Sequence, residues 1–88
     1  MKISEIQIYP IKPKDGLVAF ASVVLEDRLF IGSIGVHTRL DGSGLRITYP
    51  TKKVGDKDMN IFHPISKDFG AELERAIITR AETLLTNY

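Results

Sequence analysis

The sequence contains no cysteine and only two histidines among its 88 residues. The absence of cysteine excludes disulfides, thiolate chemistry and cysteine-ligated zinc sites, and it fits the reducing cytosol. No apolar run approaches the roughly 20 residues that span a membrane, and the N-terminal stretch MKISEIQIYP does not have the layout of a signal peptide. These absences predict a cytoplasmic protein that makes no membrane contact.

The length of the chain predicts one domain, spanning residues 1–88. Apolar residues make up 43% of the sequence, which suffices for one modest core. A core of this size stabilises a domain only marginally, and no disulfide can add to it. Self-association is therefore the expected additional source of stability.

The net charge of +1 hides an uneven distribution of charged residues. Residues 1–53 carry a net charge of +3, whereas residues 54–88 carry −2. The stretch from Arg39 to Lys53 contains four basic residues and a single acid, Asp41. A local basic patch of this kind attracts polyanions regardless of the overall charge.

Alternating and β-branched segments predict strands over the first two thirds of the chain. The run LVAFASVVL is apolar on both faces, with the odd-numbered residues from Leu17 to Leu25 on one face and Val18, Phe20 and Val24 on the other. Turn signals separate the segments, the strongest being LDGSG, and residues 51–58 are expected to form a polar loop. The expected strands are residues 2–11, 17–25, 29–39, 45–50 and 59–63.

A helix is predicted over residues 66–86, where the apolar period changes. Ser66 is a suitable N-cap, and the carboxylate of Asp68 suits the first turn of a helix. The apolar stripe of this helix is expected to contain Phe69, Leu73, Ala76, Ile77, Ala81 and Leu84.

The order of elements and the short connections between them predict an α+β fold, in which an antiparallel sheet of about five strands carries one C-terminal helix. Five strands span roughly 24 Å, whereas a helix is only about 10–12 Å across. One helix therefore leaves much apolar sheet surface uncovered. A symmetric homodimer is the simplest way to cover that surface.

His63 is the obvious candidate for catalysis, because histidine titrates near neutral pH. Neither His63 nor His37 lies in a motif that supplies a nucleophile, a carboxylate partner or metal ligands. No helix opens directly after the glycines of DGSG, so they do not form a phosphate-binding loop. We therefore expect two structural histidines and no catalytic residue, metal, cofactor or small-molecule substrate. A small hydrolase that uses His63 is the least favoured alternative.

Basic side chains are the remaining functional candidates. Lys52 and Lys53 follow a strand-ending proline, so their ammonium groups should project from a loop. Arg46 is expected on the outward face of the preceding strand, and Arg75 and Arg80 lie off the apolar stripe of the helix. Such groups can contact phosphates without reading bases. A dimer would align two sets of them across a two-fold axis, as duplex-binding proteins do.

Four segments of the chain resemble the stage V sporulation protein G family, also called the septation protein family. The most specific feature is a Pro-Thr-Lys-Lys step followed, after a loop, by His-Pro-Ile. One departure is the Ile34-Gly35-Val36 step, where many members have Ile-Arg-Val. The resemblance extends over nearly the whole chain, and the matching segments are KISEIQIYPI, LVAFASVVLEDRLFI, GLRITYPTKK and NIFHPIS.

The resemblance implies a small, dimeric, bacterial regulator of sporulation, septation or cell division that binds DNA and, in some members, RNA. It implies no enzymatic activity. It places nucleic-acid contact on the basic loop and on the helix, and hence on Lys52 and Lys53, with Arg75 and Arg80 as further candidates. The alternative is a protein-interaction module, in which the sheet edge or the helix binds another protein and the lysines serve only solubility.

Overall fold

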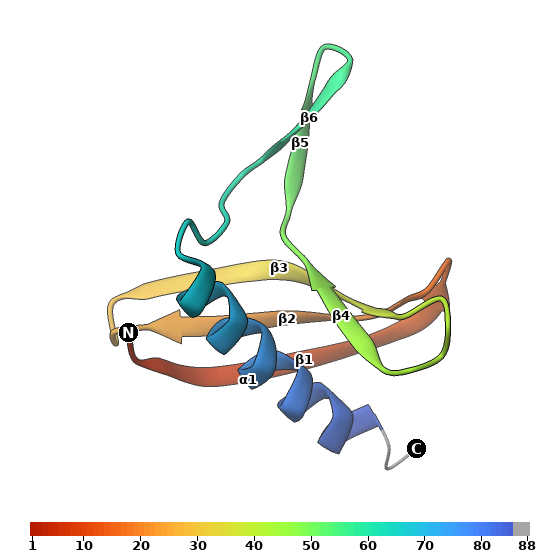
Figure 1. Cartoon of the computed structure of the whole chain (residues 1–88), viewed down its shortest axis with the longest axis horizontal. Helices are drawn as coiled ribbons and strands as arrows, with labels where there is room; N and C mark the ends of the chain where they lie inside the picture. The colour runs from red at the N-terminus through yellow and green to blue at the C-terminus, as the bar shows by residue number, and fades with distance from the viewer. Residues whose placement is uncertain (86–88) are drawn as a thin grey trace.

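The computed structural model describes residues 1–85 and shows a sheet, a helix packed on it and a projecting hairpin (Figure 1). The elements are β1 (Ile3–Lys14), β2 (Leu17–Leu25), β3 (Leu29–Thr38), β4 (Leu45–Thr48), β5 (Thr51–Val54), β6 (Lys57–Asn60) and α1 (Lys67–Leu85). β1 to β4 form an antiparallel sheet in chain order, so each strand pairs with the next one. The α+β class with one C-terminal helix is confirmed.

The core lies between α1 and the face of the sheet that α1 covers (Figure 1). Its members on β2 are mostly small, whereas those on α1 include two large aliphatic side chains. Small residues on the sheet leave room for large side chains on the helix. The buried hydrophobic residues are Ala19, Ala21, Val23, Leu25, Ile34, Val36, Leu73, Ile77 and Ala81.

β-bulges interrupt the side-chain alternation on both neighbours of β2. β1 has an extra residue at Glu5, where φ is 47°, and β3 has one at Ser33, where φ is 59°. Because a bulge removes one residue from the alternation, apolar residues three positions apart can face the same side. The pairs that reach the core in this way are Ile3 with Ile6 and Ile31 with Ile34.

The predicted faces of β2 are right from Ala19 to Leu25 and wrong at the start of the strand. Val18 packs against the core, although it was expected on the other face. A Cβ added to Gly35 would lie 3.4 Å from Leu17 Cδ1, so Leu17 lies on the face turned away from α1, called the open face from here on. The register shift between Leu17 and Ala19 accounts for the exchange, because it places Val18 outside the regular alternation.

β1 runs to Lys14, beyond the predicted end of the first strand at residue 11. Pro10 and Pro13 lie within it. Proline is tolerated there because β1 is an edge strand, and an edge strand has one side on which no ladder hydrogen bond is needed. β3 and β4 end one and two residues earlier than predicted, at Thr38 and Thr48.

Residues 51–60 form a two-stranded hairpin, so the predicted polar loop over residues 51–58 is wrong. β5 and β6 pair only with each other, and the predicted strand at 59–63 does not join the main sheet, which has four strands. The two-residue turn begins with Gly55, whose φ of 64° costs glycine no strain. A Gly-Asp turn between short segments indicates a hairpin, but the few apolar residues around it obscured the signal.

α1 begins close to the predicted position. The Oγ of Ser66 accepts a hydrogen bond at 3.2 Å from the N–H of Phe69, which confirms Ser66 as the N-cap. Gly70 lets the preceding segment pass close by, because a Cβ there would lie 3.3 Å from Pro64 Cγ. The predicted end of the helix at residue 86 lies outside the described residues.

The predicted stripe of α1 is confirmed at its centre, where Leu73, Ile77 and Ala81 are buried. It fails at its end, because Leu84 is 38% exposed and Leu85 packs against the core instead. A spacing of four residues from Ala81 leads to Leu85, so the stripe continues with the helical period.

Replacing Ile77 by alanine should lower the free energy of unfolding by about 2–5 kcal/mol, because the side chain is fully buried between helix and sheet. Urea denaturation followed by circular dichroism measures the loss. The matched control is Leu40→Ala, which removes a fully exposed side chain from the β3–β4 turn and should change stability by about 0.5 kcal/mol or less. Equal losses in the two variants would contradict the assigned core.

Candidate nucleic-acid interface

The hairpin of residues 51–60, called the arm from here on, projects from the rest of the molecule (Figure 1). Every residue in its two strands is exposed. The radius of gyration is 13.2 Å, whereas a compact chain of this length is expected to have about 12 Å. The arm therefore offers both of its faces to solvent and to a partner.

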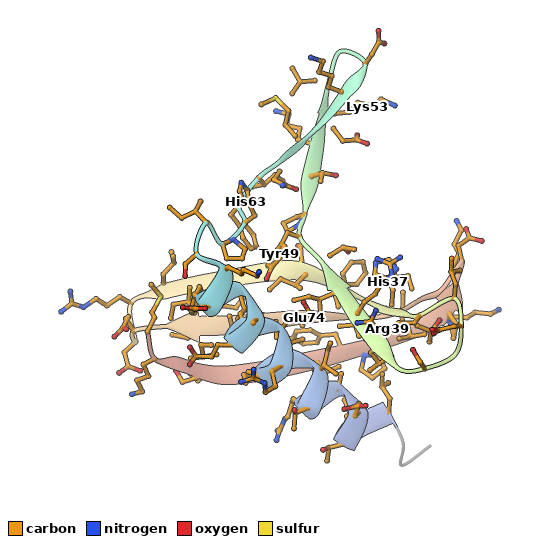
Figure 2. The ribbon with its side chains drawn as sticks, in the orientation of Figure 1. His37, Arg39, Tyr49, Lys53, His63 and Glu74 are labelled. Atoms are coloured by element: carbon orange, nitrogen blue, oxygen red, sulfur yellow. The ribbon has the colours of Figure 1, made fainter. Side chains whose placement is uncertain are left out.

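Two contacts close the base of the arm, and the second also joins it to the core. The N–H of Ile61 donates a hydrogen bond to the carbonyl of Pro50 at 2.9 Å. Next to it, the rings of Tyr49 and Phe62 meet edge to face with their centroids 6.0 Å apart, and Figure 2 shows Tyr49 at the foot of the arm. Both rings also pack against the core, and burial, together with the Glu74 carboxylate, raises the pKa of Tyr49. A partly buried aromatic contact thus sets where the arm starts.

The register gives the arm two different faces, because residues directly opposite each other in an antiparallel pair share a face. Lys53 lies opposite Asp58, so its charge is offset across the ladder. Lys52 and Lys57 lie together on the other face, opposite Met59 and Val54 respectively. This second face, called the lysine face from here on, carries two cations and no acid at its paired positions.

Arg46 lies on the open face of the sheet, directly opposite His37. A hydrogen bond of 2.9 Å links Nε2 of His37 to Oγ1 of Thr48. Gly35 leaves space for this pair, because a Cβ there would lie 2.7 Å from the Thr48 oxygen and 2.9 Å from the His37 nitrogen. Burial lowers the pKa of His37, and the positive charge of Arg46 lowers it further. The ring is therefore neutral near pH 7.

Arg75 and Arg80 are exposed on α1, which lies across the opposite face of the sheet from Arg46 (Figure 1). Arg75 borders a groove between α1 and the β3–β4 turn. In this groove Nη2 of Arg39 lies 4.0 Å from Oε1 of Glu74, and Figure 2 shows the two side chains facing each other. The acids in the groove reduce the attraction that its arginines exert on an anion.

The five predicted contact residues therefore lie on three separate surfaces. Lys52 and Lys53 share the arm but not a face, Arg46 lies on the open face, and the two helix arginines lie on α1. Lys57 was not among the predicted contact residues, yet the Gly-Asp turn brings it onto the same face as Lys52. That two-residue turn is the signal from which the lysine face could have been found.

His63 is exposed at the foot of the arm, and its Nδ1 lies 3.1 Å from the carbonyl oxygen of Pro64 (Figure 2). Within residues 1–85, no group of three or more histidine and acidic side chains could hold a metal ion. In the same part of the chain, no helix has the length and apolar character needed to cross a membrane.

The fold and the arm define a class of small α+β domains that display a basic two-stranded ribbon. The SpoVG family model matches residues 1–83. A relative from Finegoldia magna is 34% identical over 82 residues, which cover 91% of this chain and 73% of the relative. A relative from Treponema denticola is 28% identical over 79 residues, covering 89% and 83%. Both relatives carry the name septation protein SpoVG. The chain belongs to the SpoVG family, which confirms the resemblance seen in its sequence.

The lowered pKa of His37 predicts that the protein loses stability as the pH falls below the ordinary histidine value of 6.5. The unfolded chain then binds a proton that the folded ring resists, so protonation favours unfolding. Urea midpoints of wild type and His37→Gln at about pH 7.5 and about pH 5.5 measure the effect. The acid-induced loss should be smaller in the variant, and an equal loss in both proteins would show that His37 does not cause it.

Proposed function

We propose that this chain is a homodimeric, cytoplasmic regulator of the septation type that binds nucleic acid, carries out no catalytic step and uses the arm as its main phosphate-contacting element. The observation that carries the proposal is the lysine face, on which Lys52 and Lys57 project together from a fully exposed ribbon. Lysines placed in this way meet phosphates as charges and do not select a base sequence.

The shape of the arm supports contact with a duplex. The major groove of B-form DNA is about 12 Å wide and admits a two-stranded β-ribbon, and several DNA-binding proteins read the groove with strands. The four-residue strands of the arm are short enough to lie against one groove. Family membership and the names of the two relatives support the placement in septation.

Exposed apolar side chains next to the arm support the dimer. Ile61 and Ile65 are 63% and 95% exposed, although they lie close together in the chain. A second copy of the chain that covered this segment would bury both side chains at once. A two-fold dimer would also double the number of arms, which would raise the affinity for a long polyanion.

A protein-interaction module is the second candidate. A cleft of about 490 Å³ lies beside the edge strand β1, and its lining is mostly apolar. Under this alternative the cleft would hold a segment of another protein, and the chain would not be retained on heparin or DNA at low salt. The residues that line the cleft are Pro10, Ile11, Lys12, Pro13, Val18, Thr38, Leu45 and Leu85.

The double variant Lys52→Ala/Lys57→Ala should bind random duplex DNA more weakly than wild type and with a smaller dependence on salt. Each lost phosphate contact removes roughly 0.9 from the slope of log K against log salt, so the slope should fall by about 2. Fluorescence anisotropy across a salt series measures both quantities. The loss should be similar for unrelated DNA sequences.

Lys53→Ala is the matched control, because it removes the same charge from the same hairpin on the face where Asp58 offsets it. Its effect on affinity should be smaller than that of Lys52→Ala. If the double lysine-face variant bound duplex DNA as tightly as wild type, the arm would not be the contact element.

The double variant Ile61→Ser/Ile65→Ser should convert the dimer into a monomer, because it removes the exposed apolar side chains that the second copy would cover. Size-exclusion chromatography with light scattering measures the mass. Leu40→Ser is the control, since Leu40 is also fully exposed but lies in the distant β3–β4 turn. A mass that stays at two chains in the double variant would place the interface elsewhere.

A further inference from the structure

The open face of the sheet carries a shallow hollow between three aromatic rings. Tyr9 on β1 lies directly opposite Phe20 on β2, so the two side chains are neighbours on this face. The ring of Phe30 lies over Gly32, because a Cβ there would be 3.2 Å from Phe30 Cε1. Tyr9, Phe20 and Phe30 line one hollow of about 420 Å³, and Ser22, Gly32 and Ser33 also line it.

The exposure of these rings shows that the core does not require them. Tyr9, Phe20 and Phe30 are 50%, 38% and 67% exposed, whereas Ala19 and Ala21, which flank Phe20, are completely or almost completely buried on the other face. The hydroxyl of Tyr9 donates a hydrogen bond to Oε1 of Gln7, another residue of the open face. Flat apolar rings are thus presented to solvent by a rigid sheet.

Two cations lie on the same face of the sheet, although neither lines the hollow. The register forms one row across the four strands, in which Lys14 pairs with Leu17, Leu17 with His37, and His37 with Arg46. The next row on this face contains Tyr9 and Phe20, and the core-facing row of Ala19 and Val36 lies between the two. Among the described residues, no aspartate or glutamate occupies a paired position on this face.

Exposed rings on a face that also carries cations match the chemistry of an unpaired nucleotide, which has one flat base and one negative phosphate. Proteins that bind single-stranded nucleic acid combine aromatic stacking surfaces with basic side chains along the backbone, and four-stranded antiparallel sheets can present such rings. A duplex does not fit this surface, because its bases are stacked on each other. A second protein copy would account for the rings but would leave Lys14 and Arg46 without a role.

We propose that the open face binds single-stranded nucleic acid, with unpaired bases stacked on Tyr9, Phe20 and Phe30 and phosphates directed toward Lys14 and Arg46. This inference extends the proposed function from duplex contact at the arm to strand contact at a second site, and it rests on that function only for the class of ligand. The two sites use different side chains on different elements, so they can be tested separately.

The test compares two double variants of the full chain by fluorescence anisotropy, using a labelled single-stranded oligouridine and a labelled random duplex DNA. Tyr9→Leu/Phe20→Leu keeps apolar bulk but removes the flat rings, and it should weaken oligouridine binding about 10-fold or more while leaving duplex binding unchanged. Tyr9→Phe/Phe20→Tyr keeps two rings and should bind oligouridine as wild type does. Lys52→Ala/Lys57→Ala should show the opposite pattern, with weaker duplex binding and unchanged oligouridine binding.

Several results would overturn the inference. The first is that the leucine variant binds oligouridine as tightly as the wild type does, and the second is that the wild type does not bind oligouridine at all. The third is a change of oligomeric mass in the leucine variant, which would make the open face an interface between copies. If the wild type binds oligouridine but not duplex DNA, the arm proposal fails and the open-face site stands. Urea midpoints of all variants verify that each is folded. Arg46→Gln leaves the rings in place and serves as a second probe. Its affinity for oligouridine should depend less steeply on salt than that of the wild type.

Discussion

The whole arrangement depends on the packing of one helix against one face of one sheet. Leu73, Ile77 and Ala81 of α1 share the core with Ala19 and Ala21 of β2. A helix is about 10–12 Å across, whereas four strands span roughly 19 Å. The helix can therefore cover only part of one face and none of the other. The open face and the arm are left in solvent because residues 1–85 include no second element that covers them.

Those uncovered parts differ in shape as well as in chemistry. The arm is a narrow ribbon with two lysines on one face, which suits a groove. The open face is broad and flat and carries both aromatic rings and two cations, which suits an unpaired base that is not stacked in a helix. In this view α1 acts as the support for both surfaces and not as the main contact.

The sequence predicted the elements that follow a regular period. β2, the outward position of Arg46 on β4 and the centre of α1 were all visible in the pattern of apolar residues. The bulges at Glu5 and Ser33 were not predicted, because their only trace in the sequence is a pair of isoleucines three positions apart within each strand. The arm was not predicted either, since its strands bury nothing and so carry no apolar pattern. For the same reason Lys52 and Lys53 were identified as candidates from the sequence, but the face of the arm on which each of them lies was not predicted.

The complete exposure of the arm has a consequence for how the chain can change over time. A segment without buried side chains takes little part in cooperative folding, so substitutions within it cost the scaffold little. Selection on residues 52–59 therefore comes from what the arm touches and hardly from the need to fold. The need to preserve the fold applies again at Tyr49 and Phe62, because their rings pack against the core. Between those two rings the molecule holds a stretch that can acquire a new partner without acquiring a new fold.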